Sequence, residues 1–354
     1  MPARRTSGLP SGRSEVLVNA HQLLRGVVLV SAVAIAPVVL SGSGQDYASV
    51  GGSVPASLDC VTVPASCGFP DTTDTGVPPG TALRAVPSQV SSGPGWSYNP
   101  QGWVEVSGNG ANLTGLFIPC NLNISASNVT INADEVVTGG DFGISLSHTE
   151  GVTIENSTIS GQDAGAGRVG TAIKDVYGDS TGMVIKDDNV SDFRTGIAVS
   201  TGLVEGNYIH NPGYVGGDHT NGIFDDGSEQ PLMIKDNTIL NSLGQTDAIS
   251  LDASGTGETV ANKTIEDNLL AGGGYVIYGG ASLGNSTSNI VIEENQFSRL
   301  YFPQSGQYGP AVYFDLNGPG NVWSYNIWSG YVGLGQMLSG NTTGSDMLYA
   351  IASP

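Results

Sequence analysis

A short apolar pattern returns many times in the middle of this chain. In its first form, Val-x-Ile or a close variant is followed by polar residues and often by Asn, at 128–131, 151–156, 182–189, 202–207, 231–237, 263–268 and 289–295. In its second form, a small residue or once Val precedes an isoleucine, namely Ile144, Ile173, Ile197, Ile223, Ile249 and Ile277. The two forms alternate within repeats of about 20 to 30 residues, which is the spacing of solenoid repeats.

This alternation predicts an all-β chain in which short parallel strands stack as the coils of a single-stranded β-solenoid. One coil is too thin to bury a core, so stacked coils must share an interior column, here Ile173, Ile197, Ile223, Ile249 and Ile277. The Asn after the first form is expected at a corner, bonded to its copy in the next coil: Asn156, Asn189, Asn207, Asn237, Asn268 and Asn295. A propeller needs about 40 residues per blade, and a sandwich would lack the fixed corner Asn.

The repeats predict a β-helix over residues 101–330. A linker and N-terminal cap precede it over 46–100, and a cap or tail follows over 331–354. Within residues 1–45, arginines precede an apolar run, Gly26–Leu40, which Pro37 interrupts. The run is shorter than the roughly 20 residues of a membrane span and is typical of a secretory signal. We therefore expect a secreted monomer without a stable membrane span after cleavage; an uncleaved N-terminal anchor is the alternative.

Charge and cysteine content narrow the picture. The chain has 12 Lys and Arg against 32 Asp and Glu, a formal net charge of −20. Such a surface repels nucleic acid, and it would also repel an anionic polysaccharide unless cations bridged the two. Export permits a disulfide among Cys60, Cys67 and Cys120. We expect Cys67 to pair with Cys120, because both lie at the start of the folded region.

Candidate chemistry gathers between His210 and Asp252. Two carboxyl groups roughly 5 to 9.5 Å apart suffice for glycoside hydrolysis, and alignment on the isoleucines offers Asp226 and Asp247 on adjacent coils, with His219 assisting as acid or base. Side chains expected around them, in contact with a polysaccharide, are His210, Asn221, Asp225, Asp252, Lys174, Phe224 and Tyr278. The structural alternative is that these aspartates cap turns and that the histidines bond to loop backbone.

Two other functions remain open at this point. A polysaccharide lyase needs a base, for which Lys174 is the best candidate, and a positive charge to neutralise the uronate. Calcium, the one candidate ion, would be held by Asp225, Asp226 and Asp252, although no calcium loop of known spacing is present and no other cofactor is expected. A non-catalytic carbohydrate-binding or cell-surface β-helix is the third reading.

Several segments of the chain resemble a known group of proteins. The segments Cys67–Asp71, Ser127–Ile131, Tyr208–His210, His219–Ile223 and Ala271–Tyr275 are similar to secreted repeat proteins of actinobacteria within the pectate-lyase-like superfamily. The resemblance covers about residues 67–328 and implies a right-handed parallel β-helix. Because the superfamily includes lyases, hydrolases, epimerases, esterases and non-catalytic adhesins, the resemblance does not select a reaction.

One branch of that superfamily offers a closer comparison. The segments His219–Ile223 and Thr246–Ile249 are similar to the Asn-Thr-Asp-Gly-Ile layout of polygalacturonase-type hydrolases. Asn221 stands where that family has an aspartate, and its Gly-His-Gly and Arg-x-Lys elements are not visible. The resemblance therefore implies the fold of those hydrolases but only part of their catalytic set.

Overall fold

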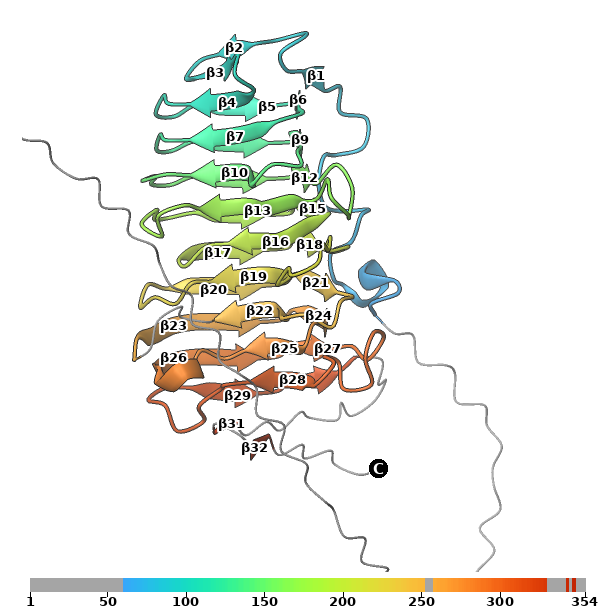
Figure 1. Ribbon diagram of the computed structural model, residues 1–354, viewed down its shortest axis with the longest axis vertical. Coiled ribbons are helices and arrows are strands. Elements are labelled where there is room, and N and C mark those ends of the chain that lie inside the picture. The colour runs from blue at the N-terminus through green and yellow to red at the C-terminus, as the bar shows by residue number, and fades with distance from the viewer. Residues whose placement is uncertain (1–59, 252–256, 330–341, 344–345, 348–354) are drawn as a thin grey trace, which may run out of the picture. The chain divides into compact units, whose positions relative to one another are not determined.

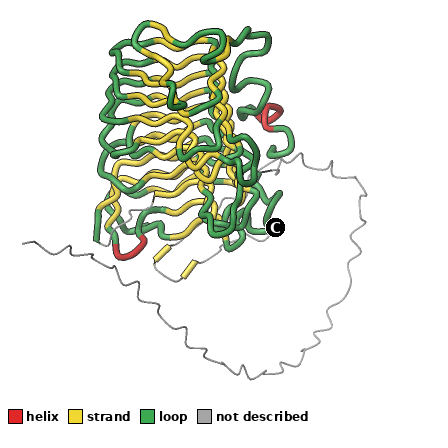
Figure 2. Tube along the Cα trace, turned by 45° about the horizontal axis from the view of Figure 1, so that its top comes forward, coloured by secondary structure: helices red, strands yellow, loops and turns green. Residues whose placement is uncertain are grey.

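The computed structural model describes residues 60–251, 257–329, 342–343 and 346–347. In this part the chain winds into an all-β parallel solenoid, and each turn contributes one strand to each of three sheets (Figure 1). The strands of successive turns lie over one another, with loops between the sheets (Figure 2). The fold class predicted from the repeats is therefore confirmed as a parallel β-helix. The segment 1–45, Asp252 and most of 331–354 lie outside the described residues.

The three sheets are named A, B and C here. Sheet A contains β1 (Arg84–Ala85), β6 (Leu116–Ile118), β9 (Glu135–Val137), β12 (Thr158–Ser160), β15 (Asn189–Ser191), β18 (Tyr208–Ile209), β21 (Thr238–Asn241), β24 (Leu269–Gly272), β27 (Gln296–Phe297) and β30 (Ile327–Trp328). Sheet B contains β2 (Ser92–Gly93), β3 (Trp96–Asn99), β4 (Trp103–Val106), β7 (Asn121–Ile124), β10 (Phe142–Leu146), β13 (Val169–Asp175), β16 (Phe193–Ala198), β19 (Asn221–Asp225), β22 (Asp247–Leu251), β25 (Tyr275–Tyr278) and β28 (Gly309–Val312).

Sheet C contains β5 (Asn112–Thr114), β8 (Thr130–Asn132), β11 (Thr153–Glu155), β14 (Val184–Lys186), β17 (Gly202–Glu205), β20 (Leu232–Lys235), β23 (Thr259–Glu266), β26 (Ser286–Glu293) and β29 (Val322–Ser324). Two short 3₁₀ turns, η1 (Pro64–Cys67) and η2 (Ser282–Gly284), and the pair β31 (Thr342–Thr343) and β32 (Asp346–Met347) complete the described elements. Pairing within the three sheets is parallel, except in β2–β3–β4, which are antiparallel and close one end of the solenoid.

The predicted isoleucine column exists and lies on the inner side of sheet B. Ile173, Ile197, Ile223, Ile249 and Ile277 are aligned in register, and all five are fully buried. The residue before each isoleucine is small, except Val276 before Ile277, because there is little space at this position. A Cβ on Gly222 would lie 2.5 Å from the carbonyl oxygen of Ala248 and 2.5 Å from Ile239, so a larger side chain would push neighbouring turns apart.

The corner between sheets C and A holds the predicted polar ladder, shifted by one residue in two turns. The side chains of Asn207, Asn237, Asn268, Asn295 and Asn326 are fully buried, and each of the first four donates through Nδ2 to the Oδ1 of the next at 2.9–3.0 Å. In earlier turns the same position is occupied by Asp134, Ser157 and Asp188.

The expectation for Asn156 is met in part, because it lies at the corner and its Nδ2 donates to Asn132 Oδ1 of the neighbouring coil at 3.3 Å, but neither Asn156 nor Asn189 belongs to the buried ladder. Asn156 has φ of 51° and occupies the left-handed turn position just before the ladder residue Ser157. Asn189 follows the ladder residue Asp188 as the first residue of β15. In each turn, the residue just before the buried ladder residue has a left-handed backbone conformation. An Asn that is one residue away from the ladder position in the sequence therefore has a different structural role.

The N-terminal part of the described chain runs along the outside of sheet A. Val61 and Phe69 pack against Leu269 and neighbouring side chains, and farther along the segment the backbone N–H of Gly76 donates to the carbonyl oxygen of Asp187 at 2.8 Å. We call residues 60–85 the N-terminal strap. The strap covers the outer face of sheet A, which leaves the outer face of sheet B available to solvent.

The disulfide prediction was wrong. Cys60 pairs with Cys67, and Cys120 is a half-buried free thiol next to β7. The loop closed by this disulfide spans seven residues within the strap, whereas Cys120 lies at the corner between β6 and β7. Over the residues described above, no helix has the length and apolar character needed to cross a membrane.

Candidate functional site

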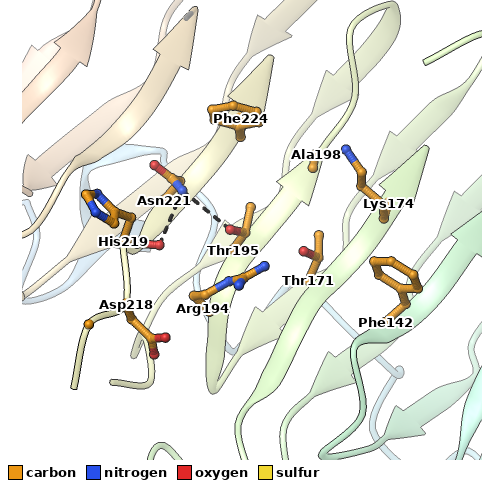
Figure 3. Close-up of a pocket in the computed structure, with 11 residues that line it drawn as sticks. Phe142, Thr171, Lys174, Arg194, Thr195, Ala198, Asp218, His219, Asn221 and Phe224 are labelled. Atoms are coloured by element: carbon orange, nitrogen blue, oxygen red, sulfur yellow. Dashed lines mark hydrogen bonds between the residues drawn. The ribbon is translucent and has the colours of Figure 1, made fainter. Parts of the chain in front are cut away.

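A cleft of about 420 Å³ opens on the outer face of sheet B, across β10, β13, β16 and β19 (Figure 3). Figure 3 shows Phe142 and Lys174 at one end and His219 and Asn221 at the other, with Arg194 between them. The complete lining is Phe142, Thr171, Lys174, Arg194, Thr195, Ala198, Gly217, Asp218, His219, Asn221 and Phe224. Sheet B therefore supplies the floor, and a loop supplies one wall.

Two rows of outward side chains form that floor. The first outer row runs through consecutive strands as Phe142, Thr171, Thr195, Asn221 and Asp247. The second outer row lies three residues farther along each strand and contains Ser145, Lys174, Ala198, Phe224, Ser250 and Tyr278. Adjacent members of a row are one strand spacing apart, about 4.8 Å. The stacking therefore places residues that are distant in sequence side by side.

The wall is the loop 210–220, which an ion pair fixes in place. Arg168, from the loop before β13, donates from Nε to Asp218 Oδ2 at 2.5 Å and from Nη2 to Oδ1 at 2.6 Å. The backbone N–H of Val215 donates to the same carboxylate at 2.8 Å. The hydrogen bonds from Arg168 hold the pKa of Asp218 below its usual range, so the carboxylate stays charged. This pair holds the neighbouring His219, which is exposed, at the rim of the cleft.

The electrostatic character of the cleft comes from Lys174 and Arg194. Neither has an ion-pair partner among the residues that the structure describes, whereas the other lysines there are paired, Lys186 with Glu155, Lys235 with Glu205 and Lys263 with Asp225. Asp218 lines the same cleft, and the charge of Arg194 helps to lower its pKa. Because Arg168, Arg194 and Lys174 surround this one carboxylate on a chain with a net charge of −20, the local field in the cleft is positive. The cleft therefore suits an anionic ligand.

Two phenylalanines add apolar surface beside these charges. Phe142 and Phe224 are half-buried members of the two outer rows. Phe224 and Lys174 also line a smaller adjoining hollow of about 100 Å³, together with Tyr177 and Asp226. Flat rings with exposed faces can pack against the apolar face of a sugar, so the combination of rings and cations matches an acidic carbohydrate.

Asn221 and Asp247 face each other from adjacent strands. As drawn in Figure 3, the Asn221 amide nitrogen lies 3.4 Å from Thr195 Oγ1 and 3.5 Å from the His219 carbonyl oxygen. With the amide turned, which pairs donors with acceptors, its nitrogen lies 3.0 and 3.2 Å from the two carboxylate oxygens of Asp247. Asp247 is only 1% exposed. Its carboxylate therefore supports Asn221 from the adjacent strand β22 and does not form part of the cleft surface.

The carboxyl pair required by the hydrolase hypothesis is not assembled. Asp247 is aligned with Asn221 at the start of the strand, whereas Asp226 is exposed and follows the end of β19. Five residues of extended chain separate these positions, about 16 Å along the strand direction. That distance exceeds the roughly 9.5 Å that an inverting pair spans. Asp226 and His219 also line different hollows.

Three more predicted site residues lie away from the cleft. Asp225 points into the coil, has no solvent exposure and pairs with Lys263; a one-residue step along a strand reverses the face. His210 follows β18 on sheet A, where it stacks on Tyr208 at 4.0 Å and its Nε2 lies 3.0 Å from Asn189 Oδ1. Burial lowers the pKa of His210 to about 4, so this ring is neutral near pH 7. Tyr278 lies in the second outer row, two strands beyond Phe224.

Among the described residues, the structure shows no cluster of ligands for the calcium ion of the sequence-based hypothesis. Within 60–251, 257–329 and the two short C-terminal pairs, no group of three or more His, Cys, Asp or Glu side chains is arranged to hold a metal ion. Of the three proposed ligands, Asp225 is paired with Lys263 inside the coil, Asp226 is exposed, and Asp252 lies outside the described residues.

Sequence reasoning missed Arg194 and the Arg168–Asp218 pair. For Lys174, the alignment of neighbouring strands does carry a signal. Lys186 and Lys235 align with Glu155, Glu205 and Glu266 on neighbouring strands, whereas Lys174 aligns with Ser145 and Ala198. Cations without an acidic neighbour in register are the ones left for a ligand. The pairing of Arg168 with Asp218 joins two loops 50 residues apart, and no repeat pattern indicates it.

Comparison with protein families and curated proteins adds no information about this site. The chain matches no protein-family model, and no curated protein shows significant similarity to it. The assignment therefore depends on the architecture and on the side chains themselves: the chain is a parallel β-solenoid with a cationic, aromatic-lined cleft on sheet B.

Proposed function

We propose that this protein binds an acidic, uronate-containing polysaccharide in the cleft on sheet B and cleaves it by β-elimination. The observation that supports the proposal is that Lys174 and Arg194, neither of which forms a salt bridge among the described residues, line one cleft. This reverses the order of our sequence-based hypotheses, because hydrolysis was preferred there for an acidic groove.

The proposed reaction uses side chains already in the cleft. Arg194 pairs with the uronate carboxylate and thereby acidifies the proton on the adjacent ring carbon. Lys174 removes that proton, the electron pair forms a carbon–carbon double bond, and the glycosidic oxygen leaves. The departing oxygen takes up a proton from water, since His219 lies at the opposite end of the cleft from Lys174 (Figure 3). The products are a new non-reducing end bearing an unsaturated uronate and a reducing end with a restored hydroxyl.

The proposal also covers the location of the protein and its superfamily. A right-handed β-helix of the pectate-lyase-like superfamily is consistent with the parallel solenoid, and secretion is consistent with the Cys60–Cys67 disulfide; the proposed protein acts as a monomer. Disulfides persist in oxidising compartments outside the cytosol. An acidic polysaccharide is itself an extracellular ligand, which supports the same location.

The test is a screen of uronate-containing polysaccharides with two readouts, ultraviolet absorbance of unsaturated uronate and affinity by calorimetry. We expect the wild type to generate absorbance, Lys174→Met to bind but not to cleave, and Arg194→Ala to lose affinity by roughly tenfold or more, the scale of a lost charge-assisted pair. Lys186→Ala is the matched control, because Lys186 is paired with Glu155 on sheet C, and it should behave as wild type.

Three results would contradict the proposal in different ways. New reducing ends without absorbance would indicate hydrolysis. Binding without any cleavage would indicate a non-catalytic carbohydrate-binding protein. Absence of binding to every acidic polysaccharide would remove the ligand class altogether.

A further inference from the structure

Four tyrosines form a continuous aromatic cluster on sheet B, on the C-terminal side of the cleft. The ring centroids are 5.7 Å apart for Tyr308 and Tyr275, 5.8 Å for Tyr275 and Tyr278, and 6.0 Å for Tyr278 and Tyr313. Tyr308 is 55% exposed and Tyr313 is 37% exposed, while the two between them are half-buried. We call these four residues the tyrosine cluster.

The cluster is in line with the cleft. Tyr278 belongs to the second outer row, in which Lys174, Ala198, Phe224, Ser250 and Tyr278 lie on successive strands. At about 4.8 Å per strand, Tyr278 is about 10 Å from Phe224 and about 19 Å from Lys174. Ala198 and Ser250 are small and nearly fully buried. Ser250, the one member of this row between Phe224 and Tyr278, therefore places no large side chain of its own between the two rings.

Core packing does not account for these tyrosines. The interior of the same turns is filled by Phe297, Phe314 and Trp323, whose rings contact one another at centroid distances of 5.6 and 6.0 Å. Phe297 and Phe314 are fully buried, whereas Tyr308 and Tyr313 present much of their surface to solvent. A group of rings with exposed faces and hydroxyls is suited to sugars, which stack an apolar face on a ring and bond through their hydroxyls.

We propose that the tyrosine cluster is a second sugar-binding subsite that holds the same polysaccharide chain as the cleft. The chain then lies across the strands of sheet B, parallel to the solenoid axis. Its acidic sugars lie beside Lys174 and Arg194, and later sugars stack on Tyr278 and Tyr313. This inference rests on the proposed function, since the occupant of the cleft is that polysaccharide. It adds a length requirement: oligosaccharides that fill only the cleft do not reach the cluster.

A length series of uronate oligosaccharides tests the inference, with affinity measured by calorimetry for the wild type, Tyr278→Ala and Tyr313→Ala. Short oligosaccharides should bind both variants as they bind the wild type. Oligosaccharides long enough to reach the cluster should bind the variants about three- to tenfold more weakly, the scale of one lost aromatic contact. Tyr325→Ala removes a more exposed tyrosine outside the cluster and should change neither value. Circular dichroism checks that each variant is folded.

The outcomes separate the two proposals. If long oligosaccharides bind both tyrosine variants with wild-type affinity, the subsite is wrong while the proposed function stands. If Arg194→Ala weakens short and long oligosaccharides alike and the tyrosine variants weaken only long ones, both stand. If the wild type binds no uronate oligosaccharide of any length, both are wrong.

Discussion

Lys263 Nζ lies 3.0 Å from Asp225 Oδ2 inside the coil, where the two side chains are 1% and 0% exposed. The same ammonium donates to the carbonyl oxygens of Ser200 and Gln230 at 2.8 Å and to Ser228 Oγ at 3.0 Å. Burial lowers the pKa of Lys263 and raises that of Asp225. This interior pair connects three successive turns. It lies on the inner side of β19, the strand that carries Phe224, and just before the loop that carries Asp226.

Removing one member of this pair should be strongly destabilising. We expect Lys263→Met to lower the free energy of unfolding by about 3–5 kcal/mol, because it leaves a buried carboxyl group and several acceptors without a donor. The double variant Asp225→Asn/Lys263→Met should recover part of the loss. Denaturant unfolding followed by circular dichroism measures both. A single variant as stable as the wild type would show that the pair contributes little.

The acidic ladder residues should make stability depend on pH. Burial raises the pKa of Asp134 to about 7 and that of Asp188 well above its usual value. One oxygen of each, Oδ2, has no hydrogen-bond partner within the described residues. In Asn207 the corresponding atom is Nδ2, which donates to Asn237 Oδ1. A protonated aspartate can supply such a donor, but a charged one cannot.

The sign of the effect follows from the raised pKa values. A raised folded-state pKa means that the native state holds its proton more tightly, so the contribution of Asp134 is present below pH 4 and is lost as pH rises to about 7. We expect Asp134→Asn and Asp188→Asn to raise the melting temperature at pH 7 and to leave it nearly unchanged at pH 4. Thermal unfolding across that range checks this, and an equal shift at both pH values would contradict it.

The Asn ladder should be far more sensitive than the turn residue beside it. Asn237 Nδ2 donates to the carbonyl oxygens of Val204 and Lys235 and to Asn268 Oδ1, all within 3.0 Å. Asn237→Ala should cost about 3 kcal/mol or more, because several buried groups lose their partners. Asn156→Gly is the control, since glycine suits its φ of 51° and it lies outside the ladder. Equal losses in the two variants, measured by denaturant unfolding, would refute the distinction.

The Arg168–Asp218 pair should control the wall of the cleft. Arg168→Ala removes both charge-assisted hydrogen bonds that hold Asp218, and the loop 210–220 should then open more often. We expect faster hydrogen exchange in residues 213–219 and weaker binding of acidic oligosaccharides, with little change in melting temperature. Exchange unchanged in this loop, relative to the wild type, would show that other contacts hold it.

The cysteine pairing can be checked chemically. A non-reduced, denatured chain should react with one equivalent of a thiol reagent, at Cys120, and peptide mapping should recover Cys60 linked to Cys67. In the folded protein the reaction should be slow, because burial raises the pKa of the Cys120 thiol and the thiolate is the reactive form. A mapped Cys67–Cys120 peptide would overturn the assignment.

The architecture could be predicted from sequence because its determinants are local and repeated. Each turn repeats an isoleucine after a small residue, and the physical need to bury that isoleucine specifies stacking without knowledge of any distant contact. The same holds for Asn237, Asn268 and Asn295, whose corner position follows from their place after the apolar strand. The pattern was less reliable where the corner residue is not Asn, as at Ser157 and Asp188.

The site depended on relations that no single repeat contains. Whether an aspartate faces a ligand or the core is decided by a one-residue step, which places Asp225 inside with Lys263 and Asp226 outside. Whether a cation is free depends on what the neighbouring turns align beside it, and this separates Lys174 from Lys186. The sequence by itself therefore determined the stacked coils and their interior column. Only the tertiary structure decided which charges are compensated and which remain in the cleft, because Coulomb interactions depend on distances between turns that the repeat spacing leaves open.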